Sequence, residues 1–135
     1  MRLAMWAYSW DIQDQGIDVV TAELHDQAQL NTVSLATSYH AGHFLQPRSP
    51  NRKSYFPEDG TVYYRPQPHL WEHKRIQPLV AQSVAERGDM LDALVKARDN
   101  GGIAVSCWTV CLHNTRLGLL HPSEVTRNAF GDPNP

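Results

Sequence analysis

Three stretches of the chain share one pattern of apolar and polar positions. Each begins as a run rich in apolar or β-prone residues and ends in aromatic, imidazole or other polar side chains. The stretches run from Leu3 to Asp11, from Thr32 to His43 and from Ile103 to Asn114. Such runs are typical of buried parallel strands that deliver side chains to a binding face at their carboxyl ends. The pattern therefore predicts three strands of one α/β sheet.

Two helical patterns lie between these strands. Within residues 14–28, apolar residues recur at three- and four-residue spacing, which predicts a helix with one buried stripe. This helix and its two flanking strands would form a βαβ unit, whose crossover is almost always right-handed. A second amphipathic pattern begins at Asp89 and predicts another helix, which is expected to stop at Asn100-Gly101-Gly102.

Residues 39–85 interrupt this rhythm. Connections in compact α/β units usually have roughly 2–6 residues, so a loop of this length is expected to be functional. Its dense prolines exclude regular helix across most of it. Ser54–Phe56 and Thr61–Tyr64 are β-prone and flank an Asp-Gly pair, which predicts a small β-hairpin. Residues 115–135 show no apolar periodicity and are expected to form an irregular tail.

Length and charge narrow the class of protein. The 135 residues are enough for one domain with a core, and residues 1–135 are expected to belong to a single domain. A formal net charge of −2 gives no electrostatic reason to expect binding to nucleic acid or to an anionic membrane. The apolar runs are too short for a membrane span or a signal core. The basic run Arg48–Lys53 is interpreted as a solvated loop.

The two cysteines, Cys107 and Cys111, lie four residues apart in one predicted strand. At that spacing both point to the same face, too far apart to bridge each other. Two buried thiols are therefore expected. They fit a reducing compartment and favour the cytoplasm.

Four short segments carry a resemblance to a known group. They are Trp6–Asp11, Ser38–His43, Phe44–Arg48 and Trp108–Asn114. Together they resemble the N-terminal part of a bacterial group of (β/α)8-barrel, glycoside-hydrolase-like proteins, and the resemblance covers essentially the whole chain. It implies a partial TIM-type barrel, because a complete one needs about 250 residues. A three-stranded piece leaves a parallel edge unpaired, so the remainder of a barrel or self-association is expected to complete it.

Sites in parallel sheets and barrels form at the carboxyl ends of the strands. The side chains expected there combine aromatic rings with hydrogen-bonding groups, a mixture that suits stacking on sugar rings and bonding to their hydroxyls. Filling the interior of the barrel is the alternative role for Trp6, Tyr8 and Trp108. The candidate substrate-binding residues are Trp10, Asp11, Tyr39, His40, His43, Trp108, His113 and Asn114.

No catalytic pair is predicted. Glycoside hydrolysis usually needs two carboxyl groups, and only Asp11 stands at a predicted strand end. It is a candidate substrate ligand, a group that orients a neighbour, or a structural residue that leads a helix. Glu58 and Asp59 are expected to be solvated at the hairpin tip.

Two other functions remain open. One is a non-catalytic binding or assembly piece that a partner chain completes. The other is a metal-dependent hydrolase in which His40, His43 and His113, with Asp11, bind zinc. Because the His-Ala-Gly-His spacing is not a strong zinc signature, neither a metal nor another cofactor is predicted.

Overall fold

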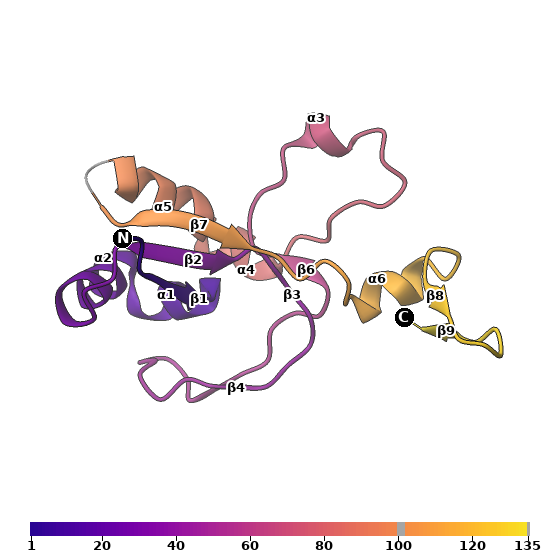
Figure 1. Cartoon of the computed structure of the whole chain (residues 1–135), viewed down its shortest axis with the longest axis horizontal. Coiled ribbons are helices and arrows are strands. Elements are labelled where there is room, and N and C mark those ends of the chain that lie inside the picture. The colour runs from indigo at the N-terminus through magenta and orange to yellow at the C-terminus, as the bar shows by residue number, and fades with distance from the viewer. Residues whose placement is uncertain (100–101, 135) are drawn as a thin grey trace.

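The computed structural model describes residues 1–99 and 102–134. Three strands lie side by side as a parallel sheet in the order β1-β2-β7 (Figure 1). The prediction of an α/β chain built on three parallel strands is therefore confirmed. Their bounds are Ala4–Ala7 for β1, Thr32–Ala36 for β2 and Ala104–Trp108 for β7.

One face of this sheet forms the first core. Val33 of β2 lies opposite Val105 of β7, and Leu35 lies opposite Ala7 of β1. Because side chains alternate between the faces of a strand, these four residues share one face. The buried members of this first core are Ala7, Ile12, Val33, Leu35, Leu94 and Ile103.

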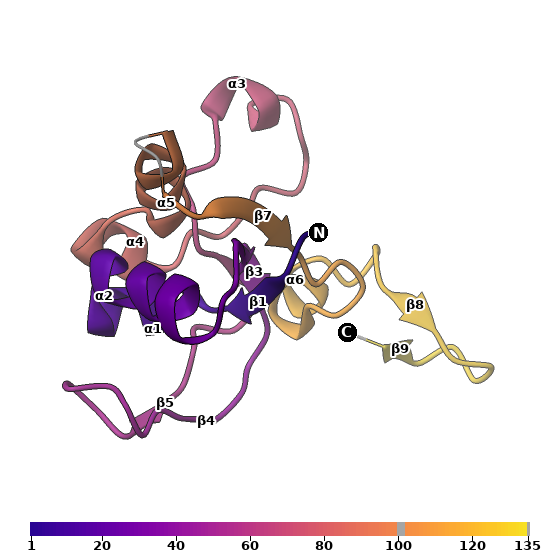
Figure 2. The same ribbon diagram turned by 60° about the vertical axis from the view of Figure 1, so that its left-hand side comes forward.

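Helices cover that same face (Figure 2). They contribute Ile12 and Leu94, both fully buried, and further apolar side chains that are partly buried against the core. The helices are α1 (Ser9–Gln15), α2 (Ile17–Ala22) with the π-helical turn η1 (Glu23–Gln27), and α5 (Met90–Asp99).

The first strand ends earlier than predicted. The chain is already helical at Ser9, so Trp10 and Asp11 belong to α1 and not to a strand end. The Asp11 carboxylate accepts a hydrogen bond from the Tyr8 N–H at 3.3 Å, which stabilises the start of a helix. Gly16, at φ 93°, then separates α1 from α2.

The helix predicted from Asp89 is confirmed as α5. Asp89 Oδ1 accepts hydrogen bonds from the N–H groups of Leu91 and Asp92 at 3.0 and 3.1 Å, so it caps the helix. Of the predicted stop, Asn100 and Gly101 lie outside the described residues. Gly102 packs so closely that a Cβ on it would lie 2.6 Å from the Ala97 carbonyl oxygen.

The hairpin predicted around Asp59-Gly60 is wrong in its pairing. β5 (Ser54–Tyr55) pairs with β4 (Phe44–Leu45), and β6 (Thr61–Val62) pairs with β3 (Ser38–Tyr39), both antiparallel. The backbone after β6 continues this contact, since Tyr63 N–H donates to the Thr37 carbonyl at 2.9 Å. Contacts with the end of β2 therefore override the local turn signal.

The turn between β5 and β6 holds other segments instead. Glu58 accepts a hydrogen bond from the Gln82 N–H at 2.6 Å, at the start of α4 (Gln82–Arg87). Asp59 accepts one from the Ala41 N–H at 2.9 Å. These carboxylates, expected to be solvated, bind backbone groups and are only partly exposed. The rest of the long loop carries the short helix α3 (Pro68–Trp71).

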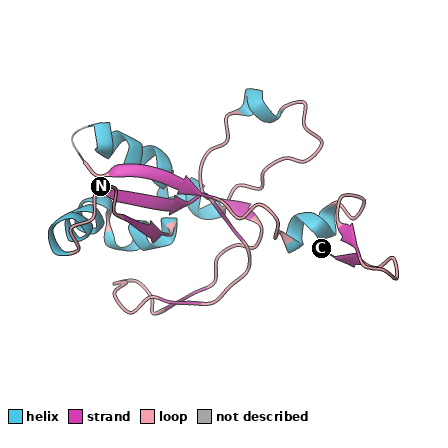
Figure 3. Cartoon of the chain, in the orientation of Figure 1, coloured by secondary structure: helices cyan, strands magenta, loops and turns pink. Residues whose placement is uncertain are grey.

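The C-terminal tail is more regular than predicted (Figure 3). It contains α6 (Thr115–Leu120) and an antiparallel pair of two-residue strands, β8 (Thr126–Arg127) and β9 (Pro133–Asn134). These elements are too short for their periodicity to stand out in the sequence. Over the described ranges, the helices are too short or too polar to cross a membrane.

Two expectations about exposure are also wrong. Cys107 and Cys111 are exposed and not buried, because β7 is an edge of the described sheet and Cys111 lies beyond its end. The basic run is bound and not simply solvated. Arg52 pairs with the buried Asp14 at 3.0 Å, and Arg48 pairs with Glu23.

Candidate functional site

Aromatic rings gather where β1, β2 and β7 end. We call Trp6, Tyr8, Trp10, Tyr39, Phe44 and Trp108 the aromatic cluster. Tyr8 lies at its centre, stacked on Trp10 with ring centroids 4.5 Å apart and in contact with Tyr39 and Phe44 at 5.1 and 5.0 Å. Trp108 contacts both Tyr8 at 5.7 Å and Trp6 at 5.8 Å. The strand ends thus bring together rings, such as those of Trp6 and Trp108, that lie far apart in the sequence.

The cluster runs from the interior to the surface. Trp10 is 1% exposed and belongs to a second core with Tyr63, Ala81 and Val84. Trp6 is 75% exposed, and the other rings of the cluster are half-buried. Trp10, predicted to bind substrate, is therefore a core residue, whereas Trp6, for which burial was an alternative, offers an open indole.

Polar groups border the half-buried rings. The Tyr8 hydroxyl donates to the Tyr39 hydroxyl at 3.4 Å, and burial together with this hydrogen bond raises the pKa of Tyr8. The Tyr39 ring stacks on His40 with centroids 4.4 Å apart, and His40 meets His113 edge to face at 4.7 Å. His40 Nδ1 lies 2.6 Å from the Ala41 carbonyl, which makes Nδ1 the donor of this hydrogen bond.

Three predicted site residues lie apart from this row of Tyr39, His40 and His113. His43 stacks on Phe56 at 4.4 Å and its Nε2 lies 2.5 Å from Ser54 Oγ. Asp11 accepts a hydrogen bond from Gln46 Nε2 at 2.8 Å, and burial raises the pKa of its carboxyl group. Asn114 Oδ1 caps α6 by accepting from the Leu117 N–H at 2.9 Å.

The histidines do not form a metal centre in this arrangement. His40 and His113 are neighbours, but His43 is held in the separate contact with Phe56. In the part of the chain that the structure describes, no three His, Cys, Asp or Glu side chains are grouped so that they can hold a metal ion. Of the possible zinc ligands, His40 and His113 therefore lie together, whereas His43 lies apart from them.

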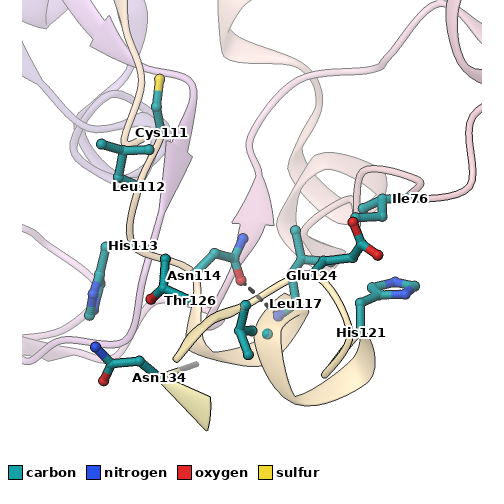
Figure 4. A pocket seen from close by; sticks show the side chains of 12 residues that line it. Ile76, Cys111, Leu112, His113, Asn114, Leu117, His121, Glu124, Thr126 and Asn134 are labelled. Carbon is teal, nitrogen blue, oxygen red and sulfur yellow. Dashed lines mark hydrogen bonds between the residues drawn. The ribbon is translucent and has the colours of Figure 1, made fainter. Parts of the chain in front are cut away.

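A cavity of about 270 Å³ lies next to the site, with His113 as one of its lining residues (Figure 4). The chain before α6 and the C-terminal segment form its walls. His113 and His121 stand on opposite sides of it in the figure and do not point toward one another. The lining of the cavity combines apolar side chains with imidazole, amide and carboxylate groups. Its lining includes His113, Asn114, Leu117, His121, Glu124 and Thr126.

The cap at Asn114 also ties the tail to the turn before β6. Asn114 Nδ2 donates to the Gly60 carbonyl at 3.3 Å, and a Cβ on Gly60 would lie 2.2 Å from Asn114 Oδ1. Gly60 also has φ 63°, so a larger residue is excluded there by both contact and backbone conformation. Asn114 is therefore a structural residue that caps α6 and ties it to Gly60.

We expect Asn114→Ala to destabilise α6 by about 0.5–2 kcal/mol, because the Leu117 N–H loses its acceptor. Hydrogen exchange of the Leu117 and Gly118 amides measures this change. Asn114→Asp keeps the acceptor and loses only the donor to Gly60, so it should leave α6 protected. Equal exchange in the wild type and in Asn114→Ala would contradict the assigned cap.

Three rings of the aromatic cluster, those of Trp6, Tyr8 and Phe44, were not among the binding residues predicted from the sequence. Trp6 and Tyr8 share a strand parity with Trp10, which was a signal for a common face but not for which ring is exposed. Phe44 was noted only as part of a motif, and no local pattern connects it to Tyr8. Its position depends on the pairing of β4 with β5.

The site is thus built of stacked rings with hydroxyl and imidazole groups along one side. It can hold a ligand by stacking and hydrogen bonding. Comparison of the chain with protein-family models, with curated proteins and with solved structures found no match.

Proposed function

We propose that this chain forms part of a (β/α)8-barrel protein resembling glycoside hydrolases and contributes one wall of a carbohydrate-binding cleft. The observation that carries the proposal is the exposed indole of Trp6. It lies against Trp108 at the carboxyl ends of parallel strands, where barrels place their sites.

The sheet supports a barrel over a doubly wound fold. A doubly wound sheet has helices on both faces, whereas a barrel has them only on the outside. Here α1, α2 and α5 pack on the face of Val33 and Leu35. The opposite face carries Ser34 and Ala36 of β2, and Trp6 and Trp108 meet across it. The two indoles would therefore lie at the mouth of such a barrel, near the carboxyl ends of β1 and β7.

The polar groups of the site match the needs of a sugar. A pyranose presents an apolar face of C–H groups and a rim of hydroxyls. The Trp6 ring supplies a surface for the apolar face, and the imidazoles of His40 and His113 lie beside the same cluster to bond hydroxyls. The stacking surface and the hydrogen-bonding groups therefore both come from residues at or after the carboxyl ends of the parallel strands.

A second candidate is a binding or assembly piece without catalytic activity. Leu3, Met5 and Trp6 are 39%, 46% and 75% exposed along β1 and its approach. β1 is an edge strand of the sheet formed by the described residues. An apolar edge of this kind favours pairing with another chain. A stable homo-oligomer that binds no sugar would support this second function.

We expect Trp6→Ala to weaken oligosaccharide binding about tenfold, equivalent to about 1.4 kcal/mol, because one stacking surface is lost. The probes are cellohexaose, xylohexaose, maltohexaose and chitohexaose, each titrated by isothermal calorimetry. Since Trp6 is exposed, the melting temperature should change little.

Trp71→Ala is the matched control. Trp71 is a partly exposed tryptophan on α3 and lies outside the aromatic cluster. Its replacement should leave the affinity unchanged. The carbohydrate proposal fails if the wild type binds none of the four probes, or if binding depends on Trp71 and not on Trp6.

A further inference from the structure

Residues 44–55 form an arm that reaches from the aromatic cluster to α1. The arm consists of β4, β5 and the loop between them, and Figure 2 shows it running below α1 and α2. Its two ends supply rings to the protein interior. Phe44 and Tyr55 lie 5.3 and 5.1 Å from the ring of Trp10. The position of the arm therefore decides the shape of one side of the cluster.

The middle of the arm is bound by a buried carboxylate. The Asp14 side chain is 0% exposed and accepts hydrogen bonds from Ser49 Oγ at 2.8 Å, Arg52 Nη2 at 3.0 Å and Asn51 Nδ2 at 3.4 Å. A fourth comes from Arg87 Nη1 of α4 at 2.6 Å. Burial alone would raise the pKa of Asp14, but Ser49, Arg87 and Arg52 outweigh it and hold the pKa below its usual value.

We call the hydrogen bonds of Asp14 with Ser49, Asn51 and Arg52 the latch. The latch differs from an exposed ion pair because the Asp14 carboxylate is buried. A buried charge is costly unless it is paired and hydrogen-bonded, and Asp14 has partners for both of its oxygens. Three of the four donors belong to the arm. The proposed carbohydrate site uses none of them, so their common role is to bind the arm to α1.

A second contact joins the latch to the rings. Gln46 is 7% exposed and donates to Asp11 Oδ1 at 2.8 Å while its own Oε1 accepts from Arg52 Nε at 3.2 Å. The Arg52 guanidinium also lies over the Tyr55 ring, 3.9 Å from its centroid. Arg52 thus contacts Asp14, Gln46 and an aromatic ring at the same time.

We propose that Asp14 is a positioning residue: by binding Ser49, Asn51 and Arg52 it holds the arm closed, and so keeps Phe44 and Tyr55 packed against the aromatic cluster. The consequence for ligand binding rests on the proposed carbohydrate function. The latch itself can be tested on the protein without any ligand.

The test is Asp14→Asn, which keeps the size of the side chain and removes its charge. We expect the Gln46 amide, bonded to the Lys53 carbonyl at 3.0 Å, to exchange at least about tenfold faster. Trypsin cleavage after Arg48 and Lys53 should accelerate to a similar extent. Amides of β2 should keep most of their protection, because the sheet does not depend on the arm.

Two further variants make the result specific. Asp92→Asn is the matched control, since Asp92 is an exposed carboxylate paired with Lys96 on α5, and the arm should stay protected. Arg52→Met keeps an aliphatic stem over Tyr55 and removes the guanidinium that donates to Asp14 and to Gln46. It should open the arm even where Asp14→Asn does not fold.

The outcomes separate the two proposals. An arm that opens while the sheet stays protected supports the latch, whether or not any sugar binds. If a probe binds the wild type, Asp14→Asn should lower its affinity, because Phe44 and Tyr55 would no longer be held against the aromatic cluster. Failure of all four oligosaccharides to bind would overturn the carbohydrate function alone. The latch is overturned if exchange of the arm is unchanged, or if arm and sheet lose protection equally.

Discussion

Replacing Trp10 by alanine is expected to lower the free energy of unfolding by about 3–5 kcal/mol, the largest effect of a single substitution that we expect for this chain. The indole is 1% exposed. It contacts Tyr8 of the cluster, Tyr55 of the arm and Tyr63 of the second core, with ring centroids 4.5–5.1 Å apart. The cavity left by its removal would open at the junction of these three regions.

Urea denaturation followed by circular dichroism measures this loss. Trp6→Ala is the matched control, because it makes the same chemical change at a side chain that is 75% exposed. Its effect should stay within about 0.5 kcal/mol, as is usual for surface positions. Equal destabilisation by the two substitutions would show that Trp10 is not a core residue.

The second large effect is expected for Leu94→Ala, at about 2–5 kcal/mol. Leu94 lies on α5, is 0% exposed and packs in the first core with Val33 and Leu35 of β2. Within α5, Leu94 is the one residue that is buried, so the cavity would loosen the whole helix. We therefore also expect faster hydrogen exchange along α5.

Leu119→Ala provides the control for this substitution. Leu119 lies on α6 and is 68% exposed, so the same loss of three carbon atoms should change the free energy of unfolding by less than about 0.5 kcal/mol. A loss below about 1 kcal/mol for Leu94→Ala would mean that α5 does not depend on this contact for its packing.

The regular part of the fold was predictable. The strands that became β1, β2 and β7 are apolar runs, and the residues of α2 and α5 recur at helical spacing. Asp89 marked the start of α5 correctly. These signals are local, since backbone conformation and burial of one face depend on neighbouring residues.

The candidate site was predictable only in part. Tyr39, His40, Trp108 and His113 were expected to meet at strand ends, and the structure places them together. Of the other four, Trp10 is buried, Asp11 and Asn114 bind helix N–H groups, and His43 contacts Phe56 and Ser54 at the surface. A histidine, an aspartate or an asparagine at a strand end satisfies a helix end or a neighbour as readily as a ligand, and the sequence does not show which partner lies nearby.

The sequence by itself determined the three parallel strands, the positions of α2 and α5 and the aromatic character of the strand ends. Only the tertiary structure decided that Trp10 is buried and Trp6 exposed, that β5 and β6 pair with different partners, and that Asp14 binds the arm. The reason is the distance along the chain. The bond from Arg87 to Asp14 joins residues 73 positions apart, and no local pattern encodes such a contact.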